Sequence, residues 1–209
     1  INNLSAWLIQ QFKPKAIINV TKLMGVKSHI PEVPSIALGS ADLSLYEMVS
    51  AYTTFANKGI HTTPLFVTHI KDKNGNLLDS FKARKNEAIS ENAAYLMLSL
   101  LQNVVNGGTS IRLRLKYELE GQIAGKTGTT NNQSDGWFMG IVPDLVSGVW
   151  TGGEERSIHF DGIRLGQGAN MALPIYGLFM QKVFADPKLS ISPEDTFKEP
   201  ENFNMDLDC

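Results

Sequence analysis

The chain has 209 residues, of which 43% are hydrophobic, and a formal net charge of -2 at pH 7. This length and apolar content suffice for one sizeable folded domain, and the near-neutral charge excludes the basic surface that nucleic acid requires. No apolar stretch is long enough to cross a bilayer, and the single cysteine, Cys209, excludes an intrachain disulfide.

The first part of the chain is predicted to be helical. Residues 4–12 and 15–24 place apolar side chains at helical spacing, with a division near Pro14 and a stop at Gly25. Residues 26–43 contain two prolines and are predicted to form a loop.

The next helix is predicted to begin at a capping box made by Ser44 and Glu47 and to end near residues 57–59. Its apolar residues recur at helical spacing and predict one buried stripe. They are Leu45, Met48, Val49, Tyr52 and Phe55.

The middle of the chain carries one hairpin signal and one helix signal. Asn74-Gly75 is typical of a tight turn and predicts a hairpin between residues 65–70 and 77–81. Ser90 is predicted to cap an apolar helix that runs to Gly107.

Three strands and a closing helix are predicted to follow. The strands are residues 121–129, 136–142 and 145–152, since each is rich in residues that favour strands. Pro174 is tolerated in a first helical turn and is predicted to open a helix over residues 175–184.

The other polar residues carry little catalytic signal. The four histidines show no metal-ligand spacing and are predicted to lie at the surface or in loops; they are His29, His61, His69 and His159. Asp135 is predicted to fix the turn between two strands. No Gly-x-Ser-x-Gly segment supports a Ser/His/Asp hydrolase, and neither a metal nor a cofactor is predicted.

The most informative segment is Lys126-Thr127-Gly128-Thr129-Thr130. In an extended edge strand, Thr127 and Thr129 point to one side, where their hydroxyls can donate to one carboxylate together. Gly128 lets another backbone approach closely, and the amide of Thr129 is free to hold an oxyanion. Lys126 supplies a positive charge beside them. The segment therefore predicts an anion site next to a reacting carbonyl.

Two alternatives compete for the same segment. A phosphate-binding loop needs four residues between its glycines and a helix directly afterwards, but Gly121 and Gly125 enclose three residues and strands follow. A Gly/Thr-rich turn between strands would explain Lys-Thr-Gly alone. The longer surrounding string favours the anion site.

The run from Lys126 to Asn132, the following Asp-x-Trp-Phe and a glycine shortly after resemble the third active-site motif of penicillin-binding proteins, most closely of the class A, bifunctional kind. Four more segments resemble the same family, in the order in which the family places them. They are residues 34–39, 45–52, 55–59 and 104–109.

The signature of this family also includes Ser-x-x-Lys, whose serine is the nucleophile, and a Ser-x-Asn motif. No serine of the chain has lysine three residues later, so the nucleophile is not in this sequence. Ser90-Glu91-Asn92 fits Ser-x-Asn literally, but Ser90 is better explained as an N-cap. By resemblance Asn2 is the motif asparagine and its serine precedes Ile1, so the chain is expected to be an excised or processed piece.

The resemblance implies an α/β fold of the α+β type, in which helices flank an antiparallel sheet. This serine β-lactamase/D,D-transpeptidase-like fold is expected to be incomplete in the chain. Residues 1–185 are expected to be the C-terminal portion of a transpeptidase domain, helical over about 1–110, with sheet strands and the closing helix over about 119–185. Residues 186–209 are expected to be an acidic, irregular and partly mobile tail.

The resemblance implies that the parent protein cross-links peptidoglycan stem peptides through a serine acyl-enzyme and is acylated by β-lactams. Its implied partners are stem peptides ending in D-Ala-D-Ala, β-lactam antibiotics and other cell-wall synthesis proteins. The parent is expected outside the cytoplasm, with a membrane anchor and a glycosyltransferase domain upstream.

The resemblance also assigns roles to residues of the chain. Lys126 and Asn2 are the catalytic residues: Lys126 interacts with the motif serine, and Asn2 orients the substrate amide and the lysine. Substrate binding falls to Thr127, Gly128, Thr129 and Thr130. Trp137 is predicted to belong to the core, with a place in the cleft wall as the alternative. Without the nucleophile the chain is expected to be inactive; the alternative function is a non-catalytic binding or scaffold module with the same fold.

Overall fold

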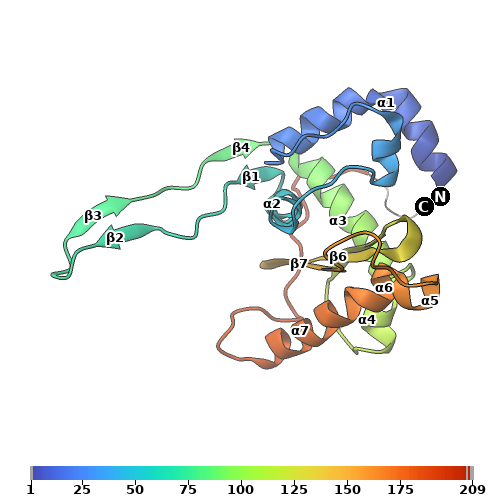
Figure 1. Ribbon diagram of the computed structural model, residues 1–209. Coiled ribbons are helices and arrows are strands. Elements are labelled where there is room, and N and C mark those ends of the chain that lie inside the picture. The colour runs from blue at the N-terminus through green and yellow to red at the C-terminus, as the bar shows by residue number, and fades with distance from the viewer. Residues whose placement is uncertain (1, 206, 208–209) are drawn as a thin grey trace. The chain divides into compact units, whose positions relative to one another are not determined.

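The computed structural model describes residues 2–205 and 207 (Figure 1). The first residue, Ile1, the last acidic residues, Asp206 and Asp208, and the lone Cys209 lie outside the described residues. The chain forms two compact units, Ile1–Ile89 and Ser90–Cys209. Both contain helices and antiparallel strand pairs, which confirms the predicted fold class. Among the described residues, no helix combines the length and apolarity needed to cross a bilayer.

The first unit begins with helix α1, Asn2–Leu23, which is interrupted at Lys13. Lys13 takes the non-helical angles φ 65 and ψ 147, and Pro14 follows it. A proline disfavours helical geometry in the residue before it, so the break lies where the sequence predicts it. Ile9 and Ile18 are the buried residues of the two halves.

The segment predicted as a loop contains a short 3-10 helix, η1, Pro34–Leu38. Helix α2, Leu45–Ala56, follows with the predicted capping box: Ser44 accepts from the Glu47 N–H, and the Glu47 side chain accepts from the Ser44 N–H. The predicted apolar stripe of α2 is only half-buried. Its most buried residues are Glu47, Ser50, Ala51 and Thr54.

The polar side of α2 is buried because other segments bond to it. Glu47 Oε1 accepts from the backbone N–H groups of Lys27 and Ser28, at 2.9 and 2.8 Å. Ser50 Oγ lies 3.1 Å from Nε2 of His61. These partners are distant in sequence, which is why apolar periodicity did not reveal the buried face.

The surface or loop position predicted for His61 is wrong. Its side chain is 6% exposed and lies on a strand. Room for the ring comes from Gly25, since a Cβ on Gly25 would overlap the imidazole. The other three histidines, His29, His69 and His159, are exposed.

A long two-stranded arm extends from the first unit, in the part of the chain between α2 and the end of this unit (Figure 1). Strands β1, Ile60–Thr62, and β4, Lys85–Glu87, pair at its base, and β2, His69–Lys71, and β3, Leu77–Ser80, pair near its tip. The predicted hairpin is confirmed, although its strands are shorter than predicted. The pairing of β1 with β4 at the base of the arm was not predicted, since each of these strands has only three residues.

The second unit begins with helix α3, Glu91–Asn106. The Ser90 side chain accepts from the Ala93 N–H at 3.3 Å, and Gly107 is the C-cap, so both predicted ends are confirmed. A one-turn helix, α4, Arg112–Leu115, follows and was not predicted.

The sheet of this unit has three antiparallel strands in the order β5-β6-β7. They are β5, Ala124–Thr129, β6, Asp135–Val142, and β7, Leu145–Gly152, all within three residues of prediction. A short 3-10 helix, η2, Asn131–Gln133, joins β5 to β6. In this strand order β5 is an edge strand.

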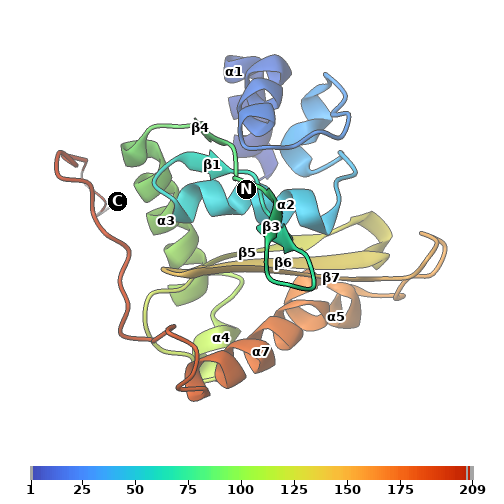
Figure 2. The same cartoon turned by 90° about the vertical axis from the view of Figure 1, so that its left-hand side faces the viewer.

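Helix α7, Leu173–Ala185, carries Pro174 in its first turn, as predicted, and lies along one face of the sheet (Figure 2). Two one-turn helices precede it, α5, Ile163–Gly166, and α6, Gly168–Met171. Neither was predicted, because four residues are too few to show helical periodicity.

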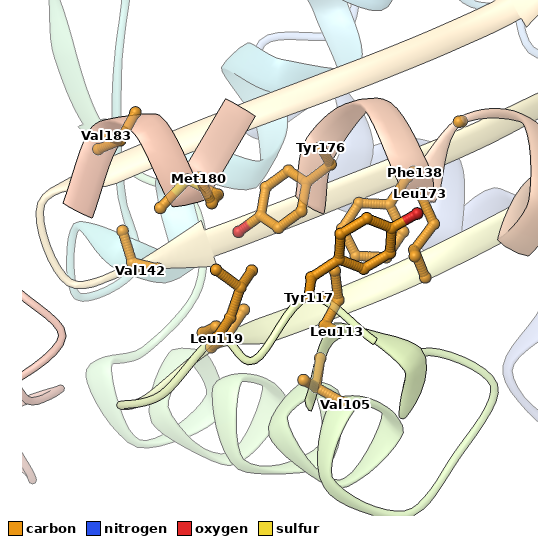
Figure 3. Close-up of a cluster of buried hydrophobic side chains, with 12 residues drawn as sticks. Val105, Leu113, Tyr117, Leu119, Phe138, Val142, Leu173, Tyr176, Met180 and Val183 are labelled. Atoms are coloured by element: carbon orange, nitrogen blue, oxygen red, sulfur yellow. The ribbon is translucent and has the colours of Figure 1, made fainter. Parts of the chain in front are cut away.

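The core of the second unit lies between the sheet, α7 and the segment around α4 (Figure 3). The Phe138 and Tyr176 rings meet at 4.7 Å between centroids and 52° between planes. The ring of Tyr176 fits over Gly140, where a Cβ would overlap it. The buried cluster comprises Val105, Leu113, Tyr117, Leu119, Ile123, Phe138, Val142, Ala172, Leu173, Tyr176, Met180 and Val183.

The described part of the acidic tail contains no helix or strand. It is nevertheless attached to the second unit by its few apolar residues. Phe197 is buried, and its N–H donates to Gln122 Oε1 at 2.7 Å. The Phe203 ring packs edge-on against Tyr95 at 5.0 Å.

Candidate functional site

Strand β5 places the Lys-Thr-Gly-Thr segment at the edge of the sheet, as predicted. Thr127 pairs with Phe138, and Thr129 pairs with Gly136. Since paired residues of antiparallel strands share a face, both threonines point to the side of Phe138. Lys126 and Gly128 point to the opposite side.

The backbone of β5 also has donors at its free edge, among them the Thr129 N–H. The Thr130 N–H donates to the Asp135 carbonyl at 3.4 Å, toward β6. Successive N–H groups of a strand point to opposite sides, so the Thr129 N–H points away from β6. An N–H in that position is able to bind a carbonyl oxygen that develops negative charge.

Each of the two threonine hydroxyls is held by a different segment. Thr127 Oγ1 lies 3.1 Å from Thr109 Oγ1, in the loop between α3 and α4. Thr129 Oγ1 accepts from the Gly168 N–H at 2.9 Å, at the start of α6. The two side chains that were predicted to bind a carboxylate are therefore each fixed by a contact with another segment of the second unit.

Lys126 is exposed, and its ammonium donates to the Thr127 carbonyl at 2.7 Å. Although the residue is exposed overall, neighbouring atoms remove part of the water around its side chain, and this desolvation lowers the pKa of Lys126 from its ordinary value because it disfavours the charged form.

The Thr130 hydroxyl is engaged within the turn that joins β5 to β6. It lies 3.0 Å from Ser134 Oγ and accepts from the Asp135 N–H at 3.1 Å. The backbone of Asp135 thus helps to close the turn for which the sequence predicted it. Trp137 is half-buried on β6, opposite Gly128.

Asn2 is exposed and is the first residue of α1, in the other unit. Its role as the motif asparagine stays a prediction. Within the part of the chain that is described, no group of three His, Cys, Asp or Glu side chains is close enough together to hold a metal ion.

Two residues of the site were not predicted. Thr109 belongs to a segment that resembles the family, but its hydroxyl had no assigned role. Gly168 carried no signal, because a glycine between Gln167 and Ala169 suggests only a turn. Both contacts join residues that are far apart in sequence, 18 residues in one case and 39 in the other.

Comparison with known proteins gives a consistent result. Residues 32–151 match the penicillin binding protein transpeptidase domain family. The chain is 34% identical over 183 residues to penicillin-binding protein 1B of Haemophilus influenzae, which covers 87% of this chain and 22% of that protein. It is 30% identical over 201 residues to penicillin-binding protein 1A of Aquifex aeolicus, covering 93% of this chain and 26% of that protein.

Solved structures share the fold at lower identity. Penicillin-binding protein 1A of Haemophilus influenzae superimposes with a TM-score of 0.82 at 22% identity, over 96% of this chain and 34% of that one. PonA1 of Mycobacterium tuberculosis in complex with penicillin V gives 0.70 at 22% identity, over 91% of this chain and 54% of that one. The chain thus spans about a quarter of the length of the curated relatives it matches.

Proposed function

The chain belongs to the penicillin-binding protein transpeptidase family, as its motifs predicted, and from this membership we propose that it is the C-terminal part of a serine D,D-transpeptidase domain. Relatives at 30% identity or more include penicillin-binding proteins 1B, 2D and 1A. The proposed reaction is the cross-linking of peptidoglycan stem peptides. The proposed parent lies outside the cytoplasm, with a membrane anchor and a glycosyltransferase domain upstream.

In the proposed reaction a serine outside these 209 residues attacks the penultimate D-Ala carbonyl of a stem peptide. The bond to the terminal D-Ala breaks, that D-Ala leaves with a proton, and an amine of a neighbouring stem peptide then takes the acyl group from the serine. β-Lactams acylate the same serine, since their ring carbonyl and carboxylate imitate the D-Ala-D-Ala end.

In this scheme the residues of the chain bind and orient the substrate. The hydroxyls of Thr127 and Thr129 donate to the terminal carboxylate of the substrate. The Thr129 N–H binds the oxyanion of the tetrahedral intermediate. Lys126 interacts with the motif serine, and Asn2 orients the substrate amide.

The observation that supports this proposal best is the arrangement on β5. The two hydroxyls, each fixed by a hydrogen bond, share one face of an edge strand, and the Thr129 N–H points to the free edge. A carboxylate and a carbonyl separated by one N–Cα unit need donors of this kind side by side. The remaining partners, β-lactams, stem peptides and other cell-wall synthesis proteins, are proposed on the family membership alone.

A fluorescent penicillin tests the proposal, with labelling read after denaturing electrophoresis. The 209-residue chain is expected to give no covalent band, because it has no Ser-x-x-Lys serine. The complete protein that contains this chain is expected to be labelled, and Thr129→Val is expected to slow its labelling. A stable band on the 209-residue chain would contradict the inference that this chain lacks the nucleophile. A complete protein that stays unlabelled would favour a non-catalytic module.

A further inference from the structure

Gly168 makes a backbone contact with the proposed carboxylate site. Its N–H donates to Thr129 Oγ1 at 2.9 Å, and both residues belong to the second unit. Gly168 is buried at the first position of α6, whereas the Thr129 side chain is exposed. A buried backbone group thus fixes the oxygen of an exposed hydroxyl.

Only glycine fits at this position. A Cβ on Gly168 would overlap the Gly128 carbonyl oxygen and would lie 2.7 Å from the Trp137 carbonyl oxygen. The approach is also close from the side of the sheet, since a Cβ on Gly136 would lie 3.0 Å from Gly168 Cα. Two glycines, Gly168 and Gly136, therefore allow α6 to pack directly on the backbone of β5 and β6.

The direction of this hydrogen bond decides what the Thr129 hydroxyl can still do. A hydroxyl has one proton and two lone pairs. Gly168 donates to one lone pair, so the proton of the hydroxyl is left for another acceptor. A carboxylate is an acceptor only, and a hydrogen bond to a charged group is stronger than one between neutral groups.

We propose that Gly168 is a positioning residue for the recognition of the substrate carboxylate, acting through the Thr129 hydroxyl. This inference rests on the proposed function. Gly168 holds the Thr129 oxygen in the rotamer in which its proton faces the substrate, and it excludes the rotamers in which the hydroxyl would turn back to the protein. It touches no reacting atom itself.

The test compares two acylating agents in the complete protein that contains this chain. One is a penicillin with its free carboxylate, and the other is the methyl ester of the same penicillin. The measured quantity is the ratio of their second-order acylation rate constants. In Gly168→Ala this ratio is expected to fall about tenfold or more, the range of one hydrogen bond to a charged group. A merely structural defect would slow both agents alike and leave the ratio unchanged.

Three variants complete the test. Thr129→Val is expected to lower the ratio as Gly168→Ala does, and the double variant is expected to lower it no further, because both changes remove one interaction. Gly162→Ala is the matched control: Gly162 has an extended backbone, and a Cβ there meets no atom within 4 Å. It is expected to keep the wild-type ratio.

Amide hydrogen exchange tests the contact without any reaction, and it also covers the case in which Gly168→Ala does not fold. The Gly168 N–H is expected to exchange slowly in the wild-type chain and faster in Thr129→Val. Equal exchange in the two proteins would overturn the proposal.

The outcomes separate this inference from the proposed function. A wild-type protein that penicillin does not acylate would overturn the proposed function and the positioning role with it. A wild-type protein that is acylated, with a ratio that Gly168→Ala leaves unchanged, would overturn the positioning role alone. A fall of the ratio in Gly168→Ala and Thr129→Val, but not in Gly162→Ala, would support it.

Discussion

Replacing Glu47 is expected to destabilise the first unit more than replacing an exposed carboxylate of the same unit. Its two oxygens accept from two backbone N–H groups, those of Lys27 and Ser28, and from the Ser28 and Ser44 hydroxyls, at 2.8 to 2.9 Å, and from the Ser44 N–H at 3.2 Å. A hydrogen bond to a charged group contributes about 1.5–3 kcal/mol, and a buried donor left without a partner costs about 1–3 kcal/mol. Because Gln keeps one oxygen, Glu47→Gln is expected to lower the free energy of unfolding by about 2–4 kcal/mol.

The effect of Glu47 should depend on pH. Desolvation alone would raise its pKa, but the hydrogen bonds from Ser28, Lys27 and Ser44 outweigh it and lower the pKa from 4.5 to about 2. A carboxyl whose pKa is lower in the folded state stabilises the fold above its unfolded pKa and loses that contribution as the pH falls. The difference between wild type and Glu47→Gln is therefore expected to be full above pH 4.5 and to shrink progressively toward pH 2.

Urea unfolding of the 209-residue chain at pH 7, 5 and 3 measures this difference, and amide exchange of Lys27 and Ser28 localises it. Glu32→Gln is the matched control, since Glu32 is exposed in the same unit. Two results would refute the reasoning: a Glu47→Gln chain as stable as Glu32→Gln at pH 7, or a difference between them that stays constant down to pH 3.

Three further changes in the second unit have expected outcomes. Gly140→Ala forces a methyl group into the Tyr176 ring and is expected to cost about 1–3 kcal/mol in urea unfolding; an unchanged midpoint would show that the ring moves aside freely. Arg114→Ala removes hydrogen bonds to the Leu119 and Gly121 carbonyls, at 2.7 and 2.8 Å, and is expected to speed amide exchange in the segment before β5, whereas unchanged exchange would contradict this anchoring. Thr109→Ala leaves the Thr127 hydroxyl without its partner and is expected to slow penicillin labelling of the complete protein severalfold, while a rate equal to wild type would show that the partner is dispensable.

The features that the sequence predicted well are those decided by neighbours in the chain. The Ser44 and Ser90 caps, the break at Pro14 and the turn at Asn74-Gly75 each depend on a few adjacent residues. The alternation of β5 also follows from the strand itself, so the common face of Thr127 and Thr129 was predictable.

The features that were missed depend on contacts between distant segments. His61 is buried because Gly25, 36 residues earlier, leaves space for its ring. Helix α6 has four residues and no periodicity, and its position depends on the close approach of Gly168 to the backbone of β5 and β6. A glycine in a sequence shows that the backbone is free to adopt unusual angles, but not which other backbone will approach it.

The contacts that fix the proposed carboxylate site predict which properties of the proposed transpeptidase should change together. Thr109 and Gly168 each contact one of the two hydroxyls, and both lie within Ser90–Cys209. The orientation of the hydroxyls is thus determined inside the second unit. Asn2 lies in the first unit, and the proposed nucleophile lies outside these residues. Changes at Thr109 and Gly168 are therefore expected to alter the preference for a carboxylate more than the intrinsic reactivity of the serine, because that preference depends on hydroxyl rotamers and the reactivity does not.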